Sequence, residues 1–256
     1  MLEKELNIAR KAAQSGGKIL ADLFGQVKQI TKKGDIDLVT EADLNSEKEI
    51  IRIIHDNFPD DNILSEEGGE LGRMTNRTWI IDPLDGTTNF VHGFPFFAVS
   101  IGLEIEQEIA LGVVFNPYLG ELFEAVKGSG AFFNNSTIHV SHTPTLAESL
   151  LATGFPYNIQ KESGNVIRLF EKMLVLSQGV RRPGSAAIDM CYVAAGRFDG
   201  FWEQNLKPWD TAAGTIIVKE AGGTLSDYTG APYNPYMHSV VAANPYIHDM
   251  MISVLS

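Results

Sequence analysis

The sequence predicts an α+β fold, with an antiparallel sheet in the N-terminal half and an α/β arrangement in the C-terminal half. Apolar residues recur at helical spacing over residues 3–24, which predicts an amphipathic helix. Short apolar runs alternate with turn sequences from residue 96 to residue 140, as in an antiparallel meander. Strand-like and helix-like segments then alternate to the end of the chain. We therefore place a soft boundary near residue 142, between halves at 1–142 and 143–256.

Two helices are expected before the meander. The first contains Gly16 and Gly17, which weaken the helical pattern because glycine is a poor helix former. The second begins where Thr40 and Asp43 have the spacing of a capping box, and it ends before Pro59. The buried stripe of this second helix is predicted to be Leu44, Ile50, Ile51, Ile54 and Phe58.

The remaining elements follow from the same patterns. Lys32–Asp35 is expected to be a loop, Glu66–Arg77 a mobile loop, and Trp79–Asp82 a short buried strand. The meander strands are predicted at residues 97–105, 109–115, 122–126 and 138–140. Later strands are predicted at 150–154, 198–203, 225–227 and 239–243, and later helices at 166–176, 185–195, 211–221 and 248–255.

The bulk composition excludes several classes of protein. The formal net charge is −12 and the pI about 4.9, which argues against a protein that binds nucleic acid or an anionic membrane. A small phosphorylated substrate is compatible, provided that a local cation offsets the acidic field. Cys191 is the only cysteine and lies in an apolar run, so we expect a buried thiol and a reducing compartment. The N-terminus lacks a signal-peptide pattern and no apolar stretch is long enough to span a bilayer, so a cytoplasmic protein is expected.

The candidate site is the run Asp82-Pro83-Leu84-Asp85-Gly86-Thr87-Thr88, which follows a buried strand. Pro83 restricts both its own backbone and that of Asp82, so the turn has a narrow geometry. Two carboxylates held together repel each other, and a divalent cation such as Mg²⁺, which prefers oxygen ligands, removes that cost. Backbone N–H groups at Gly86 and Thr87 would form an anion site if a helical turn follows. By itself this pattern is also that of an ordinary Asp/Gly turn.

Three distant carboxylates strengthen the hypothesis of a metal site. Glu66 lies 16 residues before Asp82 in a glycine-flanked loop, and Asp210 begins an apolar helix. Asp43 begins another helix, where a capping role is equally compatible. Other chemistries find no support, because the sequence has no Cys/His zinc cluster, no G-x-S-x-G elbow and no P-loop.

These motifs together resemble the inositol monophosphatase family, within the Mg-dependent, lithium-sensitive phosphatases. The run from Trp79 to Phe90 resembles the first family signature. The run Trp209-Asp210-Thr211-Ala212-Ala213-Gly214 with Glu220-Ala221-Gly222-Gly223 resembles the second. Asp37–Asp43, Ser65-Glu66-Glu67 and Gly184–Ala187 are similar to further family elements in the expected order, so the resemblance covers nearly the whole chain. It implies a layered α/β/α/β/α sandwich of the sugar-phosphatase type.

The resemblance also implies roles for individual residues. The implied metal ligands, for two or three Mg²⁺ ions, are Glu66, Asp82, the Leu84 carbonyl, Asp85 and Asp210. Thr87, oriented by Asp43, would act with Glu66 to position a metal-activated water that attacks phosphorus. The implied substrate contacts are Gly86, Thr87 and Thr88 for phosphate, and Ser185, Ala186 and Glu203 near the alcohol. No covalent phosphoenzyme is needed.

The leading expectation is hydrolysis of myo-inositol monophosphate to inositol and phosphate. Arg181-Arg182 suggests an alternative, because Arg182 beside the site would hold a second anionic group, as in fructose 1,6-bisphosphate or NADP. A third reading is a protein-binding regulator on the same scaffold, which the intact ligand set disfavours. The resemblance further implies a homodimer and sensitivity to lithium.

Overall fold

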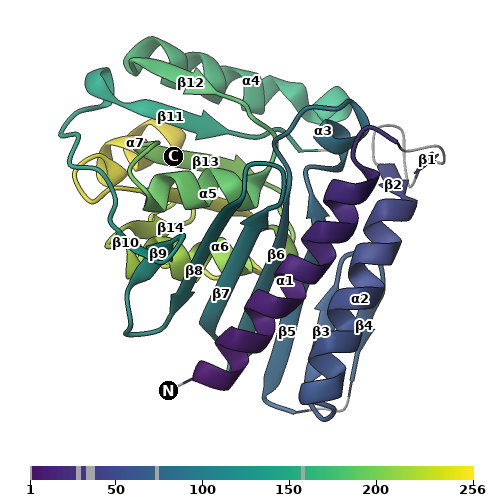
Figure 1. Cartoon of the computed structure of the whole chain (residues 1–256). Coiled ribbons are helices and arrows are strands. Elements are labelled where there is room, and N and C mark those ends of the chain that lie inside the picture. The colour runs from purple at the N-terminus through teal and green to yellow at the C-terminus, as the bar shows by residue number, and fades with distance from the viewer. Residues whose placement is uncertain (1, 27–29, 33–37, 73–74, 157–158) are drawn as a thin grey trace.

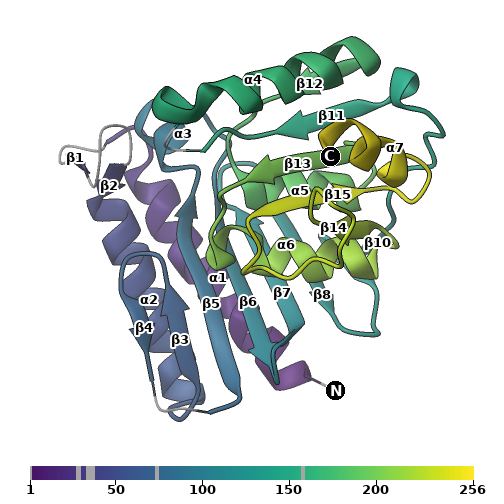
Figure 2. The same cartoon turned by 180° about the vertical axis from the view of Figure 1, so that it is seen from behind.

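The computed structural model describes residues 2–26, 30–32, 38–72, 75–156 and 159–256, which form five alternating layers of helix and sheet (Figure 1). Helices α1 (Glu3–Leu23) and α2 (Glu41–Asn57) form the first layer, over one face of an eight-stranded sheet. Helices α5 (Ala186–Ala194) and α6 (Pro208–Glu220) lie between this sheet and a five-stranded sheet. Helices α4 (Ile159–Leu176) and α7 (His248–Leu255) cover the outer face of the second sheet (Figure 2).

The eight-stranded sheet has the order β10-β9-β8-β7-β6-β5-β3-β4. All pairs of adjacent strands in this sheet are antiparallel except β3 and β5, which are parallel. Its strands are β3 (Asn62–Ser65), β4 (Gly69–Leu71), β5 (Arg77–Asp85), β6 (Ala98–Ile105), β7 (Glu108–Asn116), β8 (Glu121–Val126), β9 (Ala131–Phe133) and β10 (Ser136–Ile138). The short ladder of β1 (Ile30–Lys32) and β2 (Leu38–Thr40) leads into α2, and α3 (Thr87–Val91) follows β5. Because β3 and β5 are parallel, the C-terminal ends of both strands lie at the same end of the sheet.

The five-stranded sheet has the order β12-β11-β13-β15-β14 and mixes parallel with antiparallel pairs. Its strands are β11 (Leu150–Thr153), β12 (Gly179–Arg181), β13 (Gly200–Gln204), β14 (Thr224–Ser226) and β15 (Ser239–Ala243). A 3₁₀ turn, η1 (Leu146–Glu148), precedes β11. The two sheets share the central hydrophobic cluster through α5 and α6. The boundary near residue 142 therefore stays a prediction about how the elements are ordered along the chain.

Paired glycines let α6 approach the first sheet closely. Gly102 of β6 and Gly112 of β7 lie directly opposite each other in the antiparallel ladder. A Cβ on Gly112 would lie 2.6 Å from the Ala213 carbonyl oxygen, and one on Gly102 would lie 2.9 Å from the Ala212 Cβ. The two alanines therefore pack into a hollow that only glycine leaves open. This contact fixes the height of α6 above the sheet, and with it the position of Asp210 in the first turn of the helix.

Gly16 and Gly17 have a similar role in the first layer. Helix α1 continues through both residues, although the pair lowers helix propensity. A Cβ on Gly16 would lie 2.8 Å from Ile50 of α2, and one on Gly17 would lie 2.7 Å from the ring of Phe115 on β7. The absence of side chains lets α1 pack against both neighbours, which explains how burial outweighs propensity here.

The structure confirms the α+β class and most of the expected elements, with several corrections. Leu44 is 53% exposed, so the prediction that it belongs to the buried stripe of α2 is wrong. The expected loop at 66–77 contains β4, and Lys32 ends β1, while residues 33–35 of the other predicted loop lie outside the described residues. Strand β10 ends where the predicted strand at 138–140 would begin, α4 starts seven residues earlier than expected, and β13 starts at Gly200. Strands β9 and β12 were not predicted.

Candidate active site

The site is built around the end of β5, where Asp82 and Asp85 still pair with Ser100 and Ala98 of β6. The ladder between β5 and β6 shifts register between these residues, so the strand bulges at Pro83 and Leu84. The Asp82 side chain is 2% exposed and accepts a hydrogen bond from the Leu84 N–H at 2.9 Å. The bulge thus places two buried carboxylates at one strand end, as the sequence predicted.

Helix α2 contacts this turn from the first layer. Its capping box is present: the Thr40 N–H donates to Asp43 Oδ2 at 2.8 Å, and Thr40 Oγ1 accepts from the Ala42 N–H at 3.1 Å. The other oxygen of Asp43 lies 3.2 Å from Thr87 Oγ1, which also lies 3.0 Å from the Leu84 carbonyl oxygen. Asp43 therefore combines the capping role with the contact to Thr87 that the family resemblance implied. Burial raises the pKa of Asp43, although its hydrogen bonds oppose that rise.

The turn after Asp85 is held by α5 from the C-terminal half. Asp85 Oδ2 accepts hydrogen bonds from Ser185 Oγ at 2.6 Å and from the Ala187 N–H at 2.8 Å. Ser185 caps α5, so the predicted substrate residue supports Asp85 in this structure. Gly86 has φ +94°, and a Cβ there would lie 2.9 Å from the Phe96 carbonyl oxygen. Only glycine combines this backbone conformation with this close approach.

Glu66 and Asp210 approach the strand end from two other segments. Glu66 follows β3, and its N–H donates to the Ile81 carbonyl at 3.2 Å, next to Asp82. Asp210 lies in the first turn of α6, and its Oδ2 accepts from the Lys207 N–H at 2.6 Å. Both side chains are partly buried.

Electrostatic interactions connect these four carboxylates. Burial raises the pKa of Asp82 well above its usual value, and the charges of Glu66, Asp85 and Asp210 raise it further. Burial also raises the pKa of Asp85 to about 6, against the lowering effect of Ser185 and the N–H groups of α5. The pKa of Asp210 is raised well above its usual value by burial and then by the charge of Asp85. The site therefore concentrates negative charge that is costly without a counter-charge.

The donor set fits a hard divalent cation. Carboxylates and the Leu84 carbonyl are oxygen ligands of the type that Mg²⁺ prefers, and a cation would offset the repulsion that acts on Asp82. Within the described part of the chain, no three Asp, Glu, His or Cys side chains stand close enough to form a complete metal site as they are placed. Two of the oxygens are turned to protein donors, at Leu84 and at Ser185. The roles of the individual ligands therefore remain predictions.

A second group of charged residues lies beside the carboxylates, on the side of the C-terminal sheet. Glu203 is 8% exposed, and burial raises its pKa to about 8, with Arg182 lowering it and Asp85 raising it. The Arg182 guanidinium lies over the Phe155 ring, 5.6 Å from its centre. Ala186, the remaining expected contact, is the first residue of α5 and is buried.

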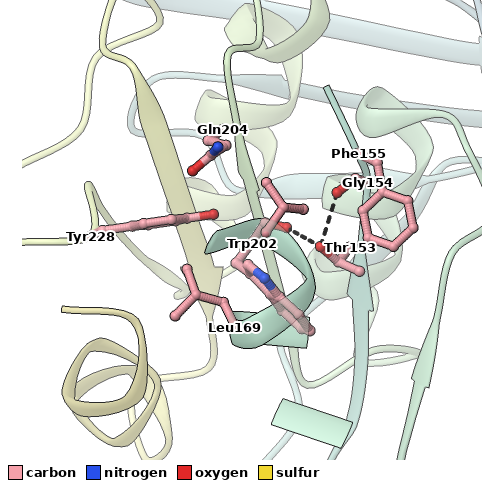
Figure 3. A pocket seen from close by; sticks show the side chains of 8 residues that line it. Thr153, Gly154, Phe155, Leu169, Trp202, Gln204 and Tyr228 are labelled. Atoms are coloured by element: carbon pink, nitrogen blue, oxygen red, sulfur yellow. Dashed lines mark hydrogen bonds between the residues drawn. The ribbon is translucent and has the colours of Figure 1, made fainter. Parts of the chain in front are cut away.

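A small pocket lies next to Glu203 but on the other face of β13. Figure 3 shows the side chains of Trp202, Gln204 and Tyr228 around it, with Thr153 at the end of β11. Thr153 Oγ1 donates to the Trp202 carbonyl at 2.7 Å, which joins the two strands there. Because side chains alternate along a strand, Glu203 points away from the face that carries Trp202 and Gln204. The pocket and the Glu203 carboxylate nevertheless approach each other at Gly154, where a Cβ would lie 2.0 Å from Glu203 Oε2.

The sequence did not single out two residues of this region. Asn89 Nδ2 donates to the carbonyls of Phe96 at 2.7 Å and Pro183 at 2.9 Å, so it joins the turn after β5 to the loop before α5. Asp189 is 1% exposed, and the charges of Glu203 and Asp85 add to burial in raising its pKa. A carboxylate inside the apolar run of α5 was the available signal for Asp189. Asn89 lies within the run from Trp79 to Phe90, but no sequence pattern there distinguishes it from its neighbours.

The fold and the acidic turn define a class: a layered α+β protein in which Asp82 interacts electrostatically with Glu66, Asp85 and Asp210 at the end of β5. The full chain, residues 1–256, matches the inositol monophosphatase family. It is 47% identical over 257 residues to the inositol-1-monophosphatase of Synechocystis sp., covering 100% of this chain and 90% of that protein. It is 39% identical over 255 residues to the fructose-1,6-bisphosphatase/inositol-1-monophosphatase of Aquifex aeolicus, covering 99% and 96%. The crystal structure of the extragenic suppressor protein suhB from Bartonella henselae is 40% identical, with a TM-score of 0.95 over 99% of both chains.

The chain belongs to the inositol monophosphatase family, as the resemblance of its motifs indicated. It is therefore a phosphatase of the hydrolase class, in a family whose members are generally metal-dependent. Among the described residues, no helix is both long enough and apolar enough to cross a membrane.

Proposed function

We propose that this phosphatase hydrolyses myo-inositol monophosphate to inositol and phosphate, with Mg²⁺ as its cofactor. The observation that carries the proposal is the placement of Asp82 and Asp85 in the bulge at the end of β5, with Glu66 held next to them. The similarity to the Synechocystis inositol-1-monophosphatase supports the choice of substrate.

Two or three Mg²⁺ ions would be held by Glu66, Asp82, the Leu84 carbonyl, Asp85 and Asp210. When bound, they supply positive charge that stabilises the negative charge developing on phosphate and leaving group. The carboxylates at Asp82 and Asp85 are already oriented by the Leu84 N–H and by the N-terminus of α5. These contacts support a site that is organised before substrate arrives.

The residues around Thr87 would orient the attacking water. If the Thr87 hydroxyl donates to Asp43 Oδ1, its lone pairs can accept a hydrogen bond from water. Glu66 would accept a second hydrogen bond from the same water. The N–H groups of Gly86, Thr87 and Thr88 would bind the phosphate, which the left-handed conformation of Gly86 supports by starting α3.

The alcohol would be recognised from the C-terminal half. Glu203 is the polar side chain proposed to contact the polyol, with Ala186 and Ser185 at the start of α5 beside it. A carboxyl group whose pKa is raised to about 8 can donate as well as accept a hydrogen bond at neutral pH, which suits a ring of hydroxyl groups.

A phosphate-release panel with titrated Mg²⁺ tests the proposal. The panel contains inositol monophosphates, fructose 1,6-bisphosphate, NADP and adenosine bisphosphates. We expect inositol monophosphate to have the highest kcat/KM and the Asp82→Asn variant to lose on the order of 100-fold or more. Cys191→Ala is the control, because Cys191 is buried in α5 without a role in the site. Mg²⁺-independent activity, or full activity in Asp82→Asn, would contradict the proposal.

A bisphosphate or NADP phosphatase is the second candidate. The favouring observation is Arg182, whose charge acts on both Glu203 and Asp189 and whose guanidinium is held over Phe155. The name of the Aquifex relative includes fructose-1,6-bisphosphatase. If Arg182 binds a second anionic group, Arg182→Ala will lower kcat/KM for the bisphosphates more than for inositol monophosphate. Unchanged relative rates would eliminate this role.

The remaining expectations belong to the same proposal. We propose a cytoplasmic homodimer that binds neither nucleic acid nor membrane and that loses activity in millimolar lithium. Light scattering that gives a monomeric mass would refute the dimer. The Bartonella relative is named as an extragenic suppressor, which keeps a regulatory role as a third candidate. Catalysis that disappears in Asp82→Asn would favour the enzyme over a purely protein-binding role.

A further inference from the structure

One face of α2 contacts three chain segments that carry proposed site residues. Asp43, Ser46 and Glu47 share this face because helical residues three and four apart are neighbours. Asp43 contacts Thr87, and Ser46 Oγ donates to the Pro83 carbonyl at 3.0 Å. Figure 1 shows α2 running along the side of the sheet that carries β3 and β5.

Glu47 makes the third contact, with the turn that carries Glu66. Its Oε1 accepts hydrogen bonds from the backbone N–H groups of Glu67 at 3.1 Å and Gly68 at 3.0 Å. Glu47 is only 7% exposed, and a Cβ on Gly68 would lie 3.4 Å from its other oxygen. The carboxylate therefore lies directly against the turn between β3 and β4.

The turn is consequently held from two sides. The Glu66 N–H donates to Ile81 on β5, while Glu47 holds the next two N–H groups. Bonds from N–H groups to a carboxylate are charge-assisted and stronger than neutral ones, which offsets the cost of burying the charge. An apolar residue could fill the same space without the free-energy cost of burying a carboxylate. The two hydrogen bonds from backbone N–H groups therefore distinguish Glu47 from a residue that only packs.

We propose that Glu47 is a positioning residue that sets the direction of Glu66 toward the metal site by holding the N–H groups of Glu67 and Gly68. The inference rests on the proposed function, since it treats Glu66 as a ligand of Mg²⁺. Removing a group that orients a ligand weakens metal affinity by roughly 10- to 100-fold in other metal sites. Glu47 is not one of the proposed metal ligands or substrate contacts, so kcat at saturating metal is expected to change little.

Metal binding to the whole resting protein is the deciding measurement. Calorimetric titration with Mg²⁺, and with Mn²⁺ as a second probe, is compared for wild type, Glu47→Ala, Glu47→Gln and Glu49→Ala. We expect Glu47→Ala to weaken metal binding, and to raise the half-saturating Mg²⁺ for activity, by about 10-fold. Glutamine keeps an oxygen acceptor, so Glu47→Gln is expected to stay within about 3-fold of wild type. Glu49, a partly exposed residue on the same helix that is paired with Arg52, is the matched control and is expected to have no effect.

Two results would overturn the inference. One is unchanged metal affinity in Glu47→Ala, even if the variant melts at a lower temperature, because a purely structural role predicts that pattern. The other is a Glu47→Gln variant as weak as Glu47→Ala. If Glu47→Ala does not fold, Glu47→Asp replaces it, since the shorter side chain cannot reach both N–H groups and should again weaken binding. A wild-type protein that binds Mg²⁺ without releasing phosphate would contradict the proposed function and leave the positioning test readable.

Discussion

At the scale of single residues, polar contacts with neighbouring groups orient the carboxylates of the site. Asp85 is oriented by Ser185 and α5, and Asp82 by the N–H two residues ahead of it. The carboxylates thereby keep fixed directions although they repel one another. The direction of each proposed ligand therefore depends on the neighbouring group that donates a hydrogen bond to it.

Glu203 provides a residue-scale prediction of pH dependence. Burial raises the folded-state pKa to about 8, above the usual value of a glutamate, while Arg182 opposes and Asp85 reinforces the rise. A folded state that holds the proton more tightly loses stability relative to the unfolded state as pH rises from about 4.5 to about 8. Glutamine does not titrate. We therefore expect Glu203→Gln to gain stability relative to wild type at pH 8 compared with pH 5.

Thermal unfolding in metal-free buffer, measured for both proteins at both pH values, checks this expectation. The relevant quantity is the difference in Tm between variant and wild type. Asp85 and the other titrating groups act in both proteins, so their contributions largely cancel in that difference. A difference that does not change with pH would show that Glu203 is ionised over the whole range.

Sequence reasoning reached some of these residues and missed others for physical reasons. The contact between Asp43 and Thr87 was implied by the family resemblance and is present. Glu47 was missed because a glutamate on a helix gives no signal that distinguishes a buried acceptor from a solvated charge. Its partners are backbone N–H groups, which every residue except proline carries, so no side-chain pattern marks them.

At the scale of elements, glycine decides how closely helices pack. Gly17 in α1 faces Phe115, whereas Gly164 in α4 has open space where a side chain would project. Alanine at either position gains roughly 0.5–1 kcal/mol of helix stability. At Gly17 the new Cβ would lie 2.7 Å from the Phe115 ring, and such overpacking typically costs about 1–3 kcal/mol.

We therefore expect Gly17→Ala to destabilise the protein and Gly164→Ala to leave it unchanged or slightly more stable. Urea unfolding of the two variants and wild type measures the difference in free energy. Equal stability of the two variants would indicate that α1 shifts to accept the methyl group. The pair is well matched, because both substitutions add the same atoms inside a helix.

Element boundaries were less predictable than element types. The strands β9 and β12 have three residues each, too few for alternation to emerge from the background. Leu44 looked like part of an apolar stripe, yet the register that buries Asp43 and Glu47 turns Leu44 to solvent. The buried face of α2 therefore combines polar residues in its first half with Ile50, Ile53 and Ile54 in its second half.

At the scale of the whole molecule, the site joins segments from both halves of the chain. The end of β5 belongs to the first sheet, while Asp210 and the N-terminus of α5 come from the central helix layer. Sequence periodicity predicted strands and helices in order, but the layering came from the family resemblance. Long-range packing such as the seat of α6 on paired glycines is set by contacts that local patterns do not encode.

Bringing four carboxylates together predicts a conflict between stability and function. At pH 8 without Mg²⁺, Asp82→Asn replaces a carboxyl group that is costly to ionise among its acidic neighbours, while the amide oxygen can still accept from the Leu84 N–H. We expect this variant to melt at a higher temperature than wild type. Added Mg²⁺ should raise the Tm of wild type, because it binds the folded state, and have little effect on the variant.

Differential scanning calorimetry with EDTA and with Mg²⁺ gives the four required Tm values. A variant that melts below wild type in EDTA would mean that Asp82 is stabilising without metal. An equal Mg²⁺ response in both proteins would place the ion elsewhere.

The hollow formed by Gly102 and Gly112 has a consequence for dividing the chain. A cut near residue 142 would leave β5 on one fragment and Asp210, carried by α6, on the other. Each fragment would lack part of the proposed ligand set, and the fragments would complete it only when Ala212 and Ala213 return to the glycines. The protein therefore has the layout of a split enzyme, in which phosphate release would report that two separately made pieces have found each other.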